Sequence, residues 1–286
     1  MPRLHKELIK INGTEIFILR IDAKDPRGVI VIPPLIGGNA LQQYHFFKVL
    51  SRSYTMVLFE YRGHGKSKGQ FDIRNSIEDT KKIVDYAYKI NNSQKIYGLA
   101  DCYGSIPLMK SVSDREDIFE SILLINPIPN LQYTMGPKDV LKHYFLRNGK
   151  VYISNPFDLK DIVFYINCIL FPDIEKSKNH FGLLNYSHLK AYSLLRDYLF
   201  YRIEKKIQIK QVPVCIFYGT KDSLLRLDNK EEIKKYEHNF LKMIKNLTIK
   251  AIEGGDHFFI KTNNKRKIEQ LQSFFTHLPS LSAGTT

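Results

Sequence analysis

Cys102 lies in a run of turn residues, Ala100-Asp101-Cys102-Tyr103-Gly104-Ser105, between a strand-like and a helix-like segment. A tight strand-to-helix turn lifts one side chain above the edge of a sheet, where a thiol can act as a nucleophile. Such a turn requires small residues two before and two to three after the nucleophile, as at Ala100, Gly104 and Ser105. Ser105 is excluded as the nucleophile, because a tyrosine would then stand at a small-residue position. The helix that follows points backbone N–H groups at Cys102, which favours a thiolate and an oxyanion.

Alternating strand-like and helix-like segments must position this turn, and they indicate an α/β fold with a mostly parallel sheet. Asn12-Gly13 is a two-residue hairpin signal, so the first two strands are expected to be antiparallel. Ser76 and Asp79 form a capping-box-like pair before a predicted helix at 77–90. The other predicted helices are at 41–50, 231–244 and 265–276, with a short one ending near 112. Strands are predicted at 6–11, 15–21, 29–32, 56–61, 95–99, 121–126, 212–218 and 247–252.

The segment 128–209 breaks this alternation, because it is rich in aromatic residues and has no clear strand. We therefore predict a sheet core formed by 1–127 and 210–277, a helical cap insertion at 128–209 and a disordered tail at 278–286. The aromatic residues of the insertion either line an acyl pocket or form its own small core; they are Tyr144, Phe145, Phe157, Phe164, Tyr165, Phe171 and Phe181.

The composition narrows the possible partners. At 286 residues the chain can bury a full core. It has no run of about 20 apolar residues that would span a membrane, and its N-terminus has no apolar signal-peptide core. We expect a soluble, cytoplasmic protein. The net charge of +14 comes without a nucleic-acid recognition motif, so nucleic acid is not expected to bind. An acidic protein or anionic ligand, or a lysine-rich surface that only solvates the chain, accounts for the charge.

The chain has three cysteines, and their spacing predicts neither a disulfide framework nor a zinc site. Cys168 lies in an apolar run at 162–170, and Cys215 lies within a predicted strand. Both are expected to be buried small hydrophobic residues. Only Cys102 has neighbours that favour catalysis.

Taken together, the motifs resemble those of the α/β-hydrolase superfamily over nearly the whole chain. The family's small-x-nucleophile-x-small-small pattern stands here at 100–105, and its second hallmark stands at 59–67 as Phe-Glu-Tyr-Arg-Gly-His-Gly-Lys-Ser. The resemblance implies that Asp222, after the seventh strand, orients the catalytic histidine, and that this histidine is His257. The order nucleophile, acid, histidine is the one that the fold uses.

Three departures from the family pattern bear on the chemistry. Cysteine replaces the usual serine, as it does in the dienelactone-hydrolase branch, and Ala100 replaces the first glycine. The oxyanion loop has Pro33-Pro34 where His-Gly is common. The first oxyanion donor is expected to be the N–H of Tyr103, and the second the N–H of Leu35 or Ile36.

Several alternatives stay open at this stage. Cys102 could mark a non-catalytic binding protein that has lost a serine, although the retained Asp222 and His257 argue against it. Asp228 could replace Asp222 as the orienting acid. Asp101 would oppose a thiolate at Cys102 unless its side chain points away. His64 and Asp256 are interpreted as turn residues.

Cysteine chemistry then limits the substrate. Attack by a thiolate on a thioester produces another thioester at little energetic cost, whereas attack on an ordinary ester or amide is uphill. We therefore expect a thioesterase or acyltransferase that forms an acyl-Cys102 intermediate, with no metal or organic cofactor. The acyl donor would be bound to coenzyme A or to an acidic acyl carrier protein. A carboxylesterase or lactonase of the dienelactone-hydrolase kind is the alternative enzyme.

Overall fold

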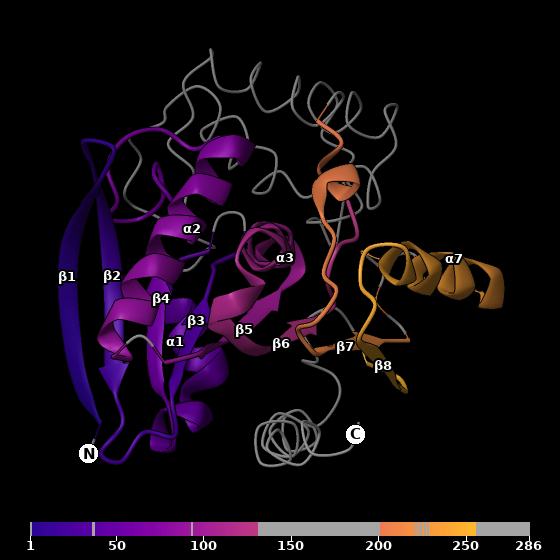
Figure 1. Ribbon diagram of the computed structural model, residues 1–286, viewed down its shortest axis with the longest axis horizontal. Helices are drawn as coiled ribbons and strands as arrows, with labels where there is room; N and C mark the ends of the chain where they lie inside the picture. Colours follow the sequence, from indigo (N-terminus) through magenta and orange to yellow (C-terminus); the bar gives the residue numbers. More distant parts are fainter. Residues whose placement is uncertain are drawn as a thin grey trace, which may run out of the picture.

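An eight-stranded, mostly parallel sheet forms the centre of the molecule, with strand order β1-β2-β4-β3-β5-β6-β7-β8 (Figure 1). The computed structural model describes residues 2–35, 38–92, 94–130, 201–220, 222, 225, 227 and 229–255. β2 is antiparallel to β1 and β4, and the other neighbours are parallel. The strands are β1 Arg3–Ile11, β2 Thr14–Asp22, β3 Val29–Ile32, β4 Thr55–Phe59, β5 Ile96–Asp101, β6 Phe119–Ile125, β7 Val214–Gly219 and β8 Leu247–Ile252.

The first two strands form the hairpin that Asn12-Gly13 predicted. Asn12 has φ 48° and Gly13 has φ 79°, the left-handed conformations that a tight two-residue hairpin turn requires. β1 lies at one edge of the sheet, and the side chains of Leu4 and Leu8 on it are 49% and 56% exposed. Every residue of β3 and β4 is buried, as expected for strands covered on both faces.

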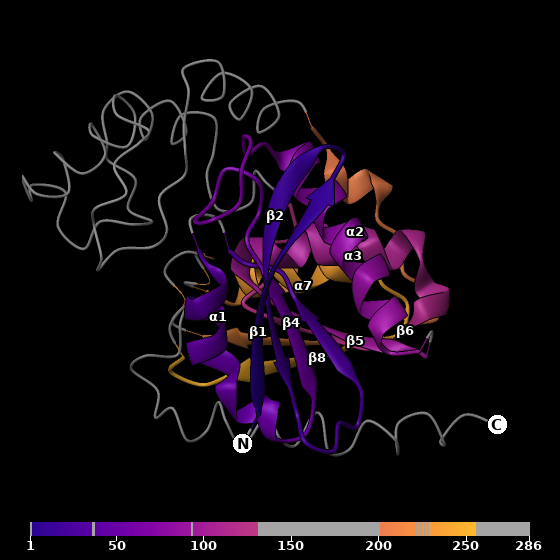
Figure 2. The ribbon, with the colours of Figure 1, turned by 90° about the vertical axis from the view of Figure 1, so that its left-hand side faces the viewer.

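Helices cover both faces of the sheet (Figure 2). Residues of α2, α3 and α7 pack into one hydrophobic cluster, and residues of α1 pack into a second cluster on the opposite face. The helices are α1 Ala40–Phe47, α2 Ile73–Ile90, α3 Ser105–Asp114 and α7 Lys230–Leu241, with short 3-10 turns η1 Lys48–Arg52, η2 Cys102–Gly104, η3 Glu116–Ile118 and η4 Ile203–Lys206. The predicted sheet flanked by helices is therefore confirmed.

The predicted start of α2 is wrong. The helix begins at Ile73, and its N-cap is Asp72, whose side chain accepts a hydrogen bond from the backbone N–H of Asn75. Ser76 and Asp79 lie inside the helix and make no capping box. Both side chains are buried and bond to other parts of the chain, because they face inward from the first two turns.

The two ends of the predicted insertion are anchored in the core. Ile128 is buried at one end, and Ile203, Ile207 and Ile209 are buried at the other. Residues 131–200, the predicted helix at 265–276 and the predicted tail lie outside the described residues, so the cap stays a prediction. Within the described part of the chain, no helix has the length and apolar character needed to cross a bilayer.

Candidate active site

The turn that carries Cys102 has a strained backbone. β5 ends at Asp101, the turn η2 spans Cys102–Gly104, and α3 follows directly. Among the described residues, four besides glycine have a positive φ, and three of them are asparagines, which tolerate this conformation. The fourth is Cys102, with φ 47°. Backbone strain at a non-glycine residue is concentrated at functional sites, so the conformation marks Cys102 as a candidate nucleophile.

Gly104 brings the loop after β3 against this turn. A Cβ atom at Gly104 would lie 2.8 Å from the carbonyl oxygen of Pro33 and 3.2 Å from that of Pro34. The close approach explains why the turn needs glycine here. It also places Leu35, one of the two alternatives for the second oxyanion donor, in a loop that packs on the turn, and Leu35 is buried. Ile36, the other one, lies outside the described residues.

Ser105 holds the turn together. Its hydroxyl donates to the carbonyl oxygen of Cys102 at 2.5 Å and accepts from the backbone N–H of Ile128 at 3.3 Å. The side chain is fully buried. Ser105 therefore connects the turn to the loop that follows β6, and its hydroxyl serves a structural purpose.

The side chain of Asp101 is directed to α1. Its Oδ1 accepts a hydrogen bond at 3.3 Å from Nε2 of Gln43, a fully buried residue of α1. Leu99, two residues earlier, also packs into the cluster on the α1 face, whereas Cys102 belongs to the cluster that contains α2 and α3. Asp101 thus bonds to the layer opposite the one against which Cys102 packs.

Tyr103, whose N–H is the expected first oxyanion donor, is held through its side chain. The phenol oxygen lies 2.7 Å from Oγ of Ser76 on α2. Its ring contacts Tyr61 and Phe71 edge to face, at centroid distances of 6.2 and 6.1 Å. With only 2% of Tyr103 exposed, the residue after the candidate nucleophile is fixed on several sides.

Asp222 lies just beyond the carboxyl end of β7 and is 2% exposed. Its Oδ1 accepts from the backbone N–H of Leu225 at 3.0 Å. Asp228, the alternative acid, and His257, the expected base, both lie outside the described residues. The loop that leads toward His257 is nevertheless bound to the loop that leads to Asp222, because Gly254 N–H donates to Thr220 Oγ1 at 2.9 Å.

The strand order brings these residues to one edge of the sheet. Leu35 follows β3, Cys102 follows β5, and Asp222 follows β7, with only β6 between β5 and β7. Carboxyl ends of parallel strands meet at a common edge, which is where open α/β sheets bind their ligands.

Asn126 is a contributor that sequence reasoning missed. It follows β6, has φ 43° and is fully buried. Its Oδ1 accepts from Gly219 N–H at 2.8 Å, and its own N–H donates to Phe217 O at 2.7 Å. The residue thereby fixes the end of β7, from which Asp222 projects. A polar residue that ends an apolar strand directly before Pro127 was the available signal.

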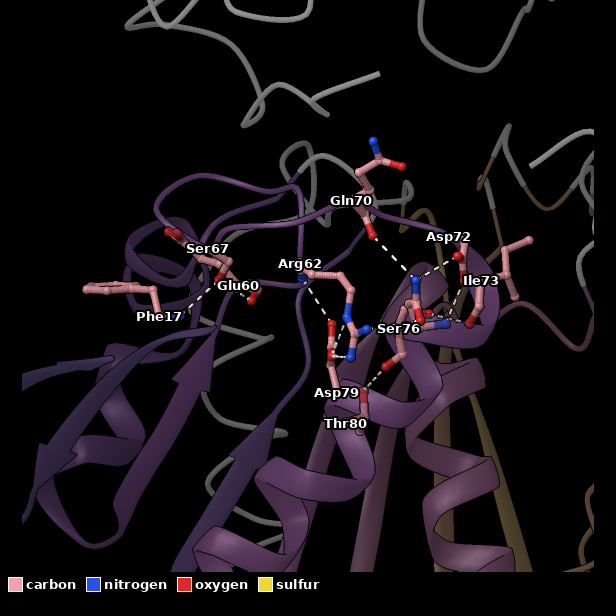
Figure 3. A network of polar contacts seen from close by, with 11 residues as sticks. Phe17, Glu60, Arg62, Ser67, Gln70, Asp72, Ile73, Ser76, Asp79 and Thr80 are labelled. Atoms are coloured by element: carbon pink, nitrogen blue, oxygen red, sulfur yellow. Dashed lines mark hydrogen bonds and ion pairs between the residues drawn. The ribbon is translucent and has the colours of Figure 1, made fainter. Parts of the chain in front are cut away.

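The loop after β4 supports the site from the side of α2 (Figure 3). Arg62 binds Asp79 through its side chain and through its backbone N–H, at 2.9 and 3.0 Å for Nε and N. Glu60 is buried beneath this loop, and burial raises the pKa of its carboxyl group. His64 is fully buried, and its ring packs against those of Tyr61 and Phe71.

The second described cysteine has another environment. Cys215 is 4% exposed within β7, and burial raises the pKa of its thiol to about 11. Cys168 lies outside the described residues. Across the part of the chain that the structure describes, no group of three or more histidine, cysteine or acidic side chains is placed to hold a metal ion.

Sheet, helical layers and strand-to-helix turn together define an α/β-hydrolase fold, and solved structures agree. Est1E from Butyrivibrio proteoclasticus, with ferulic acid bound, is 16% identical with a TM-score of 0.66, over 96% of this chain and 99% of that chain. Epoxide hydrolase VrEH1 from Vigna radiata is 16% identical with a TM-score of 0.63, over 96% and 98%.

Haloalkane dehalogenase DatA from Agrobacterium tumefaciens C58 is also 16% identical, with a TM-score of 0.62 over 96% of this chain and 97% of that chain. No protein-family model matches the chain, and no curated protein matches it. The likeness therefore extends to the fold, while the chemistry has to be argued from the site.

Proposed function

We propose that the protein is an acyl-transfer enzyme, a thioesterase or acyltransferase, that works through a covalent acyl-Cys102 intermediate. The observation that carries the proposal is the backbone of Cys102, which is held at φ 47° in the turn between β5 and α3. A strained turn that places one side chain at the carboxyl edge of the sheet is what a nucleophile requires. A decayed site would have no need to maintain that strain.

The proposed mechanism uses Cys102, His257 and Asp222. His257 takes the thiol proton, and the sulfur of Cys102 attacks the acyl carbonyl carbon to give a tetrahedral oxyanion. The N–H groups of Tyr103 and of Leu35 or Ile36 would stabilise that oxyanion. Its collapse breaks the bond to the leaving thiol, which takes the proton from His257. The acceptor then loses a proton to His257 and attacks the acyl group, which breaks the bond to sulfur, and His257 returns the proton to Cys102. Asp222 holds the imidazole tautomer throughout.

The choice of nucleophile supports a thioester substrate. Acyl transfer from one thiol to another leaves the acyl group equally activated, so acyl-Cys102 forms without an uphill step. Water, an amine, an alcohol or another thiol can then act as the acceptor. An ordinary carboxylic ester would instead be converted to a more reactive species, which favours the thioester reaction over the esterase alternative.

A trapping experiment tests the proposal. The full chain is mixed with the N-acetylcysteamine thioester of butyrate, quenched in acid and digested, and the peptide that contains Cys102 is analysed by mass spectrometry. We expect a butyryl adduct on Cys102 and none on Cys215. Absence of an adduct on Cys102 over a series of acyl chain lengths, with thioesters and simple esters alike, would contradict an acyl-enzyme mechanism.

The basic composition supports an acidic acyl carrier protein as the donor. A net charge of +14 would attract such a partner over long range. The attraction weakens with salt, because the Debye length falls from about 30 Å at 0.01 M to about 8 Å at 0.15 M. We expect the second-order rate with an acyl carrier protein to fall over that range while the rate with the neutral thioester stays constant. Equal salt profiles would remove the carrier protein from the proposal.

A further inference from the structure

Helix α2 contacts the candidate site at two points that lie one helical turn apart. The carboxylate of Asp79 accepts hydrogen bonds from the guanidinium and from the backbone N–H of Arg62, which lies in the loop after β4 (Figure 3). The hydroxyl of Ser76 forms a hydrogen bond with the phenol of Tyr103, which lies in the turn after β5. Both side chains of α2 are fully buried. The start of this helix therefore fixes the loop beside the site and the residue after the candidate nucleophile together.

The direction of the Ser76–Tyr103 hydrogen bond follows from the protons available. Ser76 Oγ donates to the carbonyl oxygen of Ile73 at 2.8 Å. A serine hydroxyl has a single proton, so the proton between Ser76 and Tyr103 comes from the phenol. Tyr103 O–H thus donates to Ser76 at 2.7 Å, and Ser76 passes the interaction on to the backbone of α2.

A fixed side chain at position 103 constrains the backbone at position 102. The φ of Cys102 is unfavourable for a cysteine, so the turn persists because the residues around it are held. Gly104 is held by its contact with the loop after β3, and Ser105 by its bond to Cys102 O. Tyr103 is held by its ring contacts and, at the far end of the side chain, by Ser76.

We infer that Ser76 is a positioning residue for the oxyanion hole, and that it acts through the Tyr103 hydroxyl to orient the Tyr103 N–H. The inference rests on the proposed function, because an oxyanion forms only if Cys102 attacks an acyl group. An oxyanion donor is effective over a narrow range of distance, about 2.7–3.1 Å. Release of the phenol from α2 lets residue 103 rotate, and the N–H leaves that range.

Two reactions of the same sulfur separate this role from a general loss of structure. Acylation of Cys102 by the butyryl thioester passes through an oxyanion, whereas alkylation by iodoacetamide displaces iodide and forms none. Both rates are measured on wild type, Ser76→Ala and Tyr103→Phe, each as the full chain. We expect acylation to fall by about 10- to 100-fold, part of the loss seen when a donor is removed entirely. Alkylation should change by less than about 2-fold.

The double variant Ser76→Ala/Tyr103→Phe tests whether the two hydroxyls act as one unit. If they do, its acylation rate equals that of the slower single variant, because either change removes the same interaction. Ser111→Ala is the matched control. Ser111 is a buried serine of α3, its hydroxyl bonds to Pro107 O within its own helix, and it should affect neither rate.

Three results would overturn the inference. Unchanged acylation in both single variants shows that the hydroxyl pair positions nothing. A parallel fall of acylation and alkylation shows that Ser76 acts on the thiol or on the fold. A double variant with multiplied losses shows two independent effects. If wild type itself is alkylated but never acylated, the proposed function is what fails, and the inference falls with it. If Ser76→Ala does not fold, Tyr103→Phe decides alone, since it removes the same bond and leaves α2 unaltered.

Discussion

Cys102 and Cys215 present the same side chain in two different regions of one sheet. Both are buried, at 8% and 4% exposure, and only β6 separates β5, which leads to Cys102, from β7, which contains Cys215. Cys215 has a regular strand backbone, and burial raises the pKa of its thiol to about 11. Cys102 has φ 47° and follows the end of its strand. The comparison teaches that burial does not separate the two thiols, and that the turn distinguishes a candidate nucleophile from a packing residue.

Removal of each sulfur in turn should give the largest contrast. Cys102→Ala is expected to abolish turnover, a loss of about 10³-fold or more, because no other group can form the acyl-enzyme. Cys215→Ala should retain the wild-type kcat and lower the free energy of unfolding by about 1–2 kcal/mol, through a small cavity. Steady-state rates and denaturant titrations measure the two effects. Wild-type rates in Cys102→Ala would show that the nucleophile is misassigned.

Asp222→Asn should lower the reactivity of Cys102 and leave that of Cys215 unchanged. We expect turnover to fall by about 10²- to 10⁴-fold with the fold intact, because the histidine loses its orienting acid. Alkylation of Cys215 in the unfolded chain should be unaffected. Asp228→Asn is the paired variant, and it is expected to keep most of the activity. An active Asp222→Asn together with an inactive Asp228→Asn would transfer the role to Asp228.

Gly104→Ala should weaken the turn without touching the thiol. The new Cβ would meet the carbonyl oxygen of Pro33 at 2.8 Å, so the loop after β3 must shift. We expect a loss of stability of about 1–3 kcal/mol together with lower turnover. Thermal unfolding and acylation rates on the same samples measure this. Full activity with unchanged stability would mean that the loop moves freely and that its contact with the turn has no functional weight.

The pH dependence of labelling should give the smallest and most specific difference. Iodoacetamide at pH 8 is expected to modify Cys102, the proposed nucleophile, and to leave Cys215 unmodified in the folded chain, because burial raises the pKa of the Cys215 thiol and only thiolates react. The folded pKa of Cys215, about 11, lies above the value of about 8.5 for a free cysteine. Ionisation therefore favours unfolding between these two pH values. Wild type should lose more stability over that window than Cys215→Ala does, as denaturant titrations at several pH values would measure.

Much of the site's surroundings could be predicted because the signals are local in the sequence. The hairpin at Asn12-Gly13, the strand-to-helix turn at Cys102 and the alternation of elements depend on neighbouring residues, and the structure has them. The capping interpretation of Ser76 and Asp79 failed for the opposite reason. Their partners Tyr103 and Arg62 lie 27 and 17 residues away, and a spacing of three within a helix is equally compatible with a cap and with two inward-facing side chains.

Two other features depended on three-dimensional context in the same way. Which layer Asp101 would face was undetermined until β5 was placed between α1 and α3, where Gln43 donates a hydrogen bond to the carboxylate of Asp101. Asn126 stands at the end of an apolar strand, but its partner could not be identified from the sequence, because its role depends on β7 being the neighbour of β6. The roles of His257 and Asp222 stay predictions that the proposed variants can test.

The edge strand β1 shows how lysine residues can limit the association of this chain with itself. Among the described residues, the edge of β1 that faces away from β2 has no strand neighbour. Such an edge is a template on which another chain can add, and the exposed side chains of Leu4 and Leu8 would favour that addition. Lys6 and Lys10 alternate with them on the same face and are exposed as well. An antiparallel neighbour built from a second copy would bring like charges together along the seam. We therefore expect Lys6 and Lys10 to oppose fibre-like assembly along this edge.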